Sequence, residues 1–175
     1  MASAITKIAE LNGDGSSAVI SFTSIPSTYK DLMFIGSLRN TGSGTSYVNN
    51  EVKINFNGDT GTNYWTAESY LRYNLIKFQI YSNSDRIRAI MAATTSGSTN
   101  AWGTFRFFCP GYGDPSIYKR FDGLSAVHQT GQQQNSIQGN YGWDQYAAIN
   151  RIDFTSNASM SAFETNSRIS LYGIK

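Results

Sequence analysis

KINFNGDTGTNYW, residues 53–65, passes within a few positions from a strand pattern to a turn pattern. Val52, Ile54 and Phe56 alternate with polar residues, which is the period of a strand with one buried face. Residues 57–61 then supply side chains that tolerate positive φ or close turns onto their own backbone. The stretch therefore predicts a half-buried strand that ends in a tight turn.

The same alternation of strand and turn patterns continues in both directions from this stretch. No amphipathic helix and no repeat of fixed period is evident, so we expect an all-β fold: a single antiparallel β-sandwich, jelly-roll-like, with 8–10 strands. The expected strands are residues 5–11, 18–24, 31–39, 52–57, 75–80, 86–93, 102–108, 117–127, 147–155 and 167–175.

Some segments predict more than a strand. Residues 31–39 read as buried on both faces, at least in their first half. We expect 75–80 and 86–93 to form a hairpin, and 102–108 to pair with 117–127. Residues 64–73 are aromatic but too polar in between for a continuous core strand, and the Gln/Gly-rich segment 131–143 (GQQQNSIQGNYGW) predicts a long loop.

Composition sets the class of protein. The 175 residues suffice for one domain over 1–175, with 14% aromatic and only 15% charged residues. A net charge of +2, with scattered basic residues, argues against nucleic-acid binding. No targeting segment or membrane-spanning stretch is evident, which predicts a soluble chain made in the cytoplasm without membrane contact.

The residues that carry most catalytic and metal chemistry are scarce. One cysteine, Cys109, and one histidine, His128, do not suffice for a zinc, haem or iron–sulfur site, and Cys109 reads as a small buried side chain. Most aspartates lie in turns, where the side chain caps its own backbone. The NGDG and NGDTG turns at 12–15 and 57–61 offer oxygen ligands for calcium, but turn stabilisation is the stronger reading. We expect no enzyme activity, no catalytic residue and no cofactor.

Aromatic side chains in or beside the expected loops give the one positive signal of a site. Aromatic rings that carry a polar group are common at interfaces and on surfaces that stack against sugars. Several of these rings can instead be buried at the ends of the sandwich. The interface or ligand candidates are Tyr64, Trp65, Tyr70, Tyr73, Tyr112, Tyr141, Trp143 and Tyr146.

Three segments together resemble a family of virion structural proteins from tailed bacteriophages, of the cyanophage and marine phage type. They are FTSIPSTYKDLMFIGSLR at 22–39, INFNGDTGTNYW at 54–65 and RISLYGIK at 168–175. The first resembles a corner between strands with Tyr29 anchored over the core, and the last a closing strand in which Gly173 permits close backbone approach. The resemblance implies a structural role in the virion and carries over no catalytic residue.

Within that family, members are head decoration (cement) proteins or modules of tail fibres. A lone domain without a shaft favours a decoration protein that binds the major capsid protein on the outer surface of the head, self-associates as a homotrimer and stabilises the shell. The alternative is a receptor-binding module whose aromatic loops bind a host surface glycan. A polysaccharide hydrolase is a more distant third reading, because no carboxylate pair is evident.

Overall fold

The computed structural model describes residues 4–42, 51–72, 75–94, 100–129, 132–156 and 162–175, and this part of the chain is built from β-strands without helices. Its strands are β1 (Ile5–Asn12), β2 (Val19–Phe22), β3 (Asp31–Asn40), β4 (Glu51–Phe56), β5 (Tyr64–Arg72), β6 (Leu75–Ser84), β7 (Ile87–Met91), β8 (Ala93–Thr94), β9 (Gly103–Pro110), β10 (Lys119–Gln129), β11 (Gln132–Trp143), β12 (Ile152–Ser156) and β13 (Arg168–Ile174). They number thirteen, more than the 8–10 expected.

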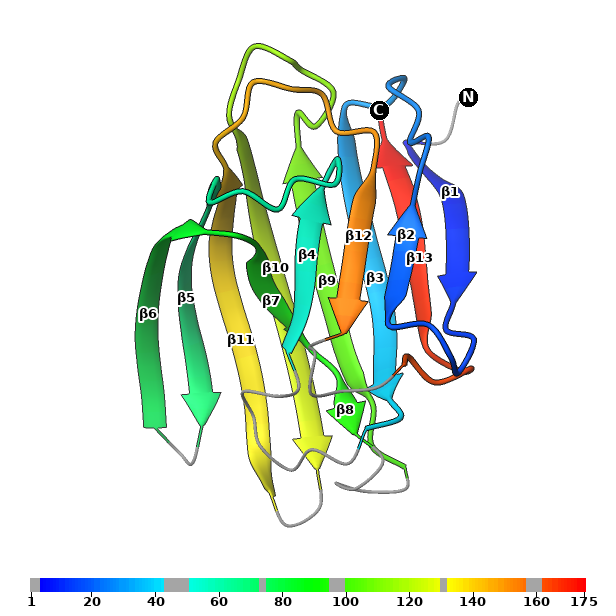
Figure 1. Cartoon of the computed structure of the whole chain (residues 1–175), viewed down its shortest axis with the longest axis vertical. Helices are drawn as coiled ribbons and strands as arrows, with labels where there is room; N and C mark the ends of the chain where they lie inside the picture. Colours follow the sequence, from blue (N-terminus) through cyan, green and yellow to red (C-terminus); the bar gives the residue numbers. More distant parts are fainter. Residues whose placement is uncertain (1–3, 43–50, 73–74, 95–99, 130–131, 157–161) are drawn as a thin grey trace.

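Two sheets pack face to face, which confirms the antiparallel β-sandwich (Figure 1). The larger sheet has the order β1-β13-β3-β9-β10-β11-β5-β6, and the short β8 pairs in parallel with β3. The smaller sheet has the order β2-β12-β4-β7. Within the described ranges there is no helix with the length and hydropathy of a membrane span.

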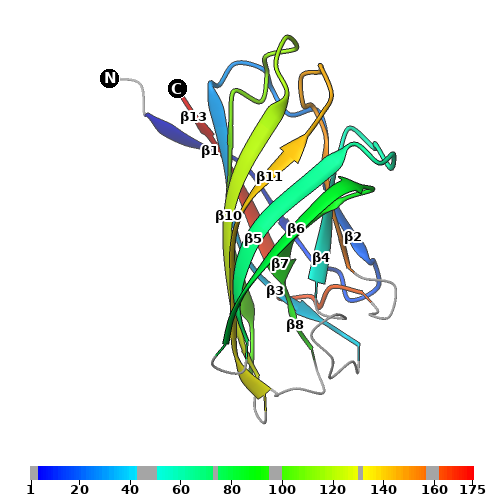
Figure 2. The ribbon, with the colours of Figure 1, turned by 90° about the vertical axis from the view of Figure 1, so that its left-hand side faces the viewer.

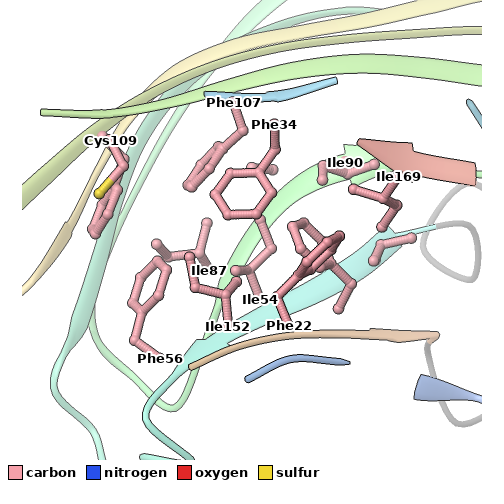
Figure 3. Close-up of a cluster of buried hydrophobic side chains, with 14 of the residues drawn as sticks. Phe22, Phe34, Ile54, Phe56, Ile87, Ile90, Phe107, Cys109, Ile152 and Ile169 are labelled. Carbon is pink, nitrogen blue, oxygen red and sulfur yellow. The ribbon is translucent and has the colours of Figure 1, made fainter. Parts of the chain in front are cut away.

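The core lies between the two sheets. Phe34 and Phe107 of the large sheet face Ile54 and Ile152 of the small sheet, and all four side chains are fully buried (Figure 3). Each comes from a strand in which buried apolar residues alternate with more exposed ones, so a shift of one residue would turn these four side chains away from the core. The pattern that predicted the strand at 52–57 therefore also fixes which face of β4 meets the large sheet.

The turn after β4 has the predicted conformation. Asn57 and Gly58 both have positive φ, 52° and 72°, and the Asp59 N–H donates to the Phe56 carbonyl over 2.9 Å. Two consecutive residues with positive φ are what a tight turn of this handedness requires, and Asn-Gly is the residue pair that supplies them at least cost.

The strands at the two ends of the chain are neighbours. β13 lies between β1 and β3 and pairs with both. A Cβ built on Gly173 would lie 2.3 Å from the Tyr29 ring, so the missing side chain of Gly173 is what lets this ring lie over β13. The closing strand is as expected, but the group that approaches Gly173 closely is the Tyr29 ring and not the backbone of another segment.

Two expected segments differ from the structure. The hairpin of 75–80 with 86–93 is wrong: β6 pairs with β5 in the large sheet, and β7 pairs with β4 in the small sheet. The apolar residues of β7 face the core whereas those of β6 face outward, so the chain passes from one sheet to the other between them. The pairing of β9 with β10 is confirmed.

The Gln/Gly-rich loop is also wrong, because residues 132–143 form β11, which pairs with β10 on one side and β5 on the other. The prediction of a loop rested on the polar residues that point outward. The buried residues Ile137, Tyr141 and Trp143 alternate with them, as in a strand. Residues 64–72 likewise form the continuous strand β5.

Two smaller differences concern single strands. β3 has an outward face where Ile35 is 43% exposed, so it is not buried on both sides. The strand expected at 147–155 begins only at Ile152.

Candidate interaction surfaces

Four of the eight aromatic candidates are interior residues, not surface ones. Tyr64, Tyr112, Tyr141 and Trp143 are at most 2% exposed and belong to the hydrophobic core, which overturns their assignment to an exposed interface or ligand site. Tyr64 lies on β5, and Tyr141 and Trp143 lie on β11. The polar residues between them are typical of loops, but the alternation of each strand turns the three rings inward. Tyr112 lies beyond the end of β9 and its hydroxyl donates to the Pro26 carbonyl.

Hydrogen bonds explain how the polar groups of Tyr64 and Trp143 are tolerated in the core. The Tyr64 hydroxyl donates to the Asp59 carbonyl over 2.9 Å and accepts from the Phe56 N–H over 3.0 Å. Burial raises the pKa of the Tyr64 hydroxyl to about 12, so the ring stays neutral. The indole N–H of Trp143 donates to Asp59 as well. These rings hold the turn at 57–61 against the large sheet.

Three of the remaining candidates are partly or largely exposed. Trp65 and Tyr70 are partly buried on β5, and Tyr146 is 62% exposed after β11. Tyr70 accepts a hydrogen bond from Gln79 and packs beside a small second core. Tyr73 lies outside the described residues.

Two of these residues join an exposed group that we call the aromatic–arginine cluster: Trp65, Tyr118, Arg120 and Tyr146. The Arg120 guanidinium carbon lies 5.0 Å from the Trp65 ring centroid and 5.7 Å from that of Tyr118. The Tyr118 and Tyr146 rings stack with centroids 4.3 Å apart. Cation–π contacts of this length are favourable and hold the side chains in place. The cluster is thus a group of surface rings packed against one guanidinium group.

The register of β5, β11 and β10 brings Trp65 and Arg120 of this cluster together. Gly142 of β11 pairs with Trp65 of β5 and with Arg120 of β10. A Cβ on Gly142 would lie 2.0 Å from the Trp65 indole nitrogen, so the ring lies across the glycine toward Arg120. Arg120 also forms an ion pair with Asp144 over 3.1 Å. Sequence reasoning found Trp65 and Tyr146 but missed Tyr118 and Arg120, because the contact depends on pairing of three strands.

A second exposed surface lies on β6, the end strand of the large sheet. Ile76, Phe78 and Ile80 are 68%, 80% and 81% exposed, and we call these three residues the β6 strip. They lie on the outer face, in register with Leu71, Ser69 and Ala67 of β5. Figure 2 shows β5 and β6 in front. A contiguous apolar surface of this kind indicates an association site.

The inner side of β5 holds a buried carboxyl group, Glu68, which is 9% exposed. Burial, with the nearby Glu51 carboxylate, raises the pKa of Glu68 to about 7, and Arg88 acts in the opposite direction. Among the described residues, neither Glu68 Oε2 nor the hydroxyl of the neighbouring Tyr141 has a hydrogen-bond partner. Because the carboxyl group is covered by protein, a polysaccharide has no direct path to it, although its pKa would suit a general acid.

Both turns weighed as calcium sites are closed by hydrogen bonds of their own. Asp14 Oδ1 accepts from the backbone N–H groups of Ser16 and Ser17 over 2.8 and 2.6 Å. Asp59 accepts from Gly61, Asn63 and Trp143. The described part of the chain contains no group of three or more side chains suited to hold a metal ion.

Cys109 is fully buried at the end of β9, and burial raises the pKa of its thiol well above the usual range. This is the buried, unreactive position expected from the sequence.

Comparison with known proteins adds little to this description. No family model and no curated protein matches the sequence. Among solved structures, the carbohydrate recognition domain of Emp47p aligns with 98% of this chain and 88% of its own, at 6% identity and a TM-score of 0.33. A likeness at that level carries no argument about function.

Proposed function

We propose that this chain is a non-enzymatic structural protein of a tailed-bacteriophage virion, a decoration protein that binds the assembled head and stabilises the shell. The observation that carries the proposal is the β6 strip, because three aliphatic and aromatic side chains at 68–81% exposure are suited to an assembly and unfavourable on an isolated chain. A protein that binds only the assembled shell shifts the assembly equilibrium toward it.

The three segments that resemble virion proteins support the same function, and so do their positions in the fold. Its three segments fall on the corner from β2 to β3, on β4 with its turn, and on β13. All three are framework elements, so the features by which a member of such a family selects its place in the virion lie elsewhere. The β6 strip and the aromatic–arginine cluster are both outside or at the margin of those segments.

Co-sedimentation tests the decoration role directly. The purified chain is mixed with heads of the encoding phage from which it has been stripped, and with unexpanded precursor shells. We expect saturable binding to the mature heads and a higher temperature of head disruption after binding. Immunogold labelling of virions gives the location independently, and gold restricted to the tail would contradict the proposal.

The second candidate function is a receptor-binding module on a tail fibre, and the aromatic–arginine cluster favours it. Stacked rings with a neighbouring arginine and an aspartate offer the flat apolar face and the polar groups that sugar recognition uses. Under this alternative, Trp65→Ala and Tyr146→Ala abolish binding to host cells or surface glycans. Trp143 is unsuitable for such a test, because it is a core residue.

A further inference from the structure

β6 is an edge strand with little protection against pairing. It pairs with β5 on one side, and no described strand pairs with its other side. Natural edge strands are usually short, charged, interrupted by proline or covered, because an open edge recruits further strands. β6 is ten residues long, contains no proline and carries one charged side chain, that of Lys77.

The other edges of the sandwich are protected in these ways. β1 carries Lys7 and Glu10, whose side chains form an ion pair over 2.6 Å. In the small sheet, β2 has only four residues, and β7 has five, with Arg88 in an ion pair with Glu51. Among the four edges, β6 alone combines length, low charge and exposed apolar side chains.

We propose that β6 pairs antiparallel with β6 of a second copy of this chain, about a two-fold axis at Phe78. In that register Phe78 lies opposite Phe78, Ile76 opposite Ile80 and Leu75 opposite Tyr81. Lys77 lies opposite Gln79, so no like charges meet. Cross-strand apolar and aromatic pairs of this kind each stabilise a sheet by roughly 0.2–1 kcal/mol, in addition to the backbone hydrogen bonds.

Neighbouring registers are less complementary. A shift of the pairing by one residue places the polar face of one copy beside the apolar face of the other. An axis at Lys77 brings two ammonium groups opposite each other, and like charges directly opposite are destabilising. An axis at Gln79 leaves Ile76 opposite Ser82 and loses one apolar pair. The axis at Phe78 matches every residue from Leu75 to Tyr81.

The contact is closed and specific. A two-fold pairing uses the same strand of both copies, so it ends at a dimer and joins the two large sheets into one continuous sheet. The homotrimer expected from the resemblance would need a different surface. The dimer goes beyond the proposed decoration function: it places the β6 strips of two copies side by side on the outer face of one continuous sheet, and it is tested on the isolated protein without heads.

Mass in solution is the first test. Light scattering after size exclusion should give twice the 19.3 kDa mass of the chain, and Phe78→Lys should halve that mass. The control is Leu124→Lys, at a site 46% exposed on the same face of the large sheet, which should leave the dimer intact. Near-UV circular dichroism should show both variants to be folded, as expected for changes at exposed positions. A wild-type monomer at all concentrations, or an oligomer that Phe78→Lys leaves unchanged, would overturn the proposal.

Cross-linking tests the register. Paired residues in an antiparallel ladder have Cα atoms roughly 4.5–5.5 Å apart, within the range of a disulfide. A mixture of Ile76→Cys and Ile80→Cys chains should therefore give a disulfide-linked heterodimer on oxidation. Either variant alone should not, because equivalent residues lie four positions apart, about 13 Å along the strand. The native Cys109 is buried and stays silent. Cross-linking of Ile80→Cys with itself and not with Ile76→Cys would contradict the axis at Phe78.

Discussion

The indole Nε1 of Trp143 donates a hydrogen bond of 2.7 Å to Asp59 Oδ2 and so joins the last residue of β11 to the turn that ends β4. The same carboxylate accepts from the Gly61 N–H and the Asn63 side chain, and these hydrogen bonds lower its pKa although burial opposes them. One aspartate thus closes its own turn and fastens that turn to the opposite sheet.

Replacement of Trp143 by Phe should therefore destabilise the fold. The variant loses a hydrogen bond to a charged group and part of a buried ring, and we expect a loss of about 2–3 kcal/mol in the free energy of unfolding in urea. Trp65→Phe is the matched control, because Trp65 is only partly buried and a phenyl ring can keep the contact with Arg120, so the substitution should cost under about 1 kcal/mol. An equal effect of the two substitutions would mean that Trp143 does not fasten the turn.

Gly173 and Tyr29 should show energetic coupling. Gly173→Ala places a methyl group where the Tyr29 ring lies, so the ring must move, and overpacking of this kind costs roughly 1–3 kcal/mol. In a Tyr29→Ala background the space is free, and the cost of Gly173→Ala should fall below about 1 kcal/mol. A double-mutant cycle of unfolding free energies measures the difference. Additive effects would show that the ring does not depend on the glycine.

Removal of β13 should prevent folding. The strand pairs with β1 on one side and β3 on the other, and Ile169 and Leu171 are core residues. A chain that ends at Ser167 would leave β1 without a partner strand and β3 open along one side, so we expect it to be insoluble or to lack a cooperative thermal transition. A chain that lacks only Lys175, which is exposed at the end of the strand, should unfold like the wild type.

The strands that the sequence predicts correctly are those in which the alternation of apolar residues and the turn-forming residues indicate the same strand boundary. Strict alternation at Val52, Ile54 and Phe56, followed by Asn57-Gly58, predicted β4 and its turn. β11 was missed because its outward residues are glutamine, asparagine and glycine, and their polarity hid the inward alternation. Strand pairing on both sides holds such a segment in place, and pairing partners are not visible in a local pattern.

The surfaces were less predictable than the fold. Aromatic residues in polar surroundings suggested loops, yet the side chains of Tyr64, Tyr141 and Trp143 point into the core. Tyr64 and Trp143 form hydrogen bonds there, and the Tyr141 hydroxyl is buried without a partner among the described residues. The apolar residues Ile76, Phe78 and Ile80 of β6 lie on the outer face of the large sheet, the face that does not meet the small sheet. Which face of an alternating strand meets the opposite sheet depends on the strand with which it pairs, and no local pattern encodes that partner.

Glu68 should make stability decline as pH rises through neutrality. Its pKa of about 7 in the folded chain is higher than the ordinary value of 4.5, so between these values the folded state holds a proton that the unfolded state has lost. The favourable contribution is complete below pH 4.5 and is lost as pH rises through 7. At 1.36 kcal/mol per pKa unit, the difference between pH 5 and pH 8 is about 2–3 kcal/mol.

Glu68→Gln tests this directly, because the amide keeps the shape of the protonated acid and does not ionise. We expect the variant to match the wild type in urea unfolding at pH 5 and to be more stable by about 2–3 kcal/mol at pH 8. Glu10→Gln is the control: hydrogen bonds from Lys7 and Ser170 lower the pKa of Glu10, so its titration ends below this window. The groups that act on Glu68 are Glu51, whose carboxylate raises its pKa, and Arg88, which lowers it. Glu51→Gln should therefore shift the decline in stability to lower pH. If the pH profile of stability is unchanged in Glu68→Gln, the pH dependence arises from another group.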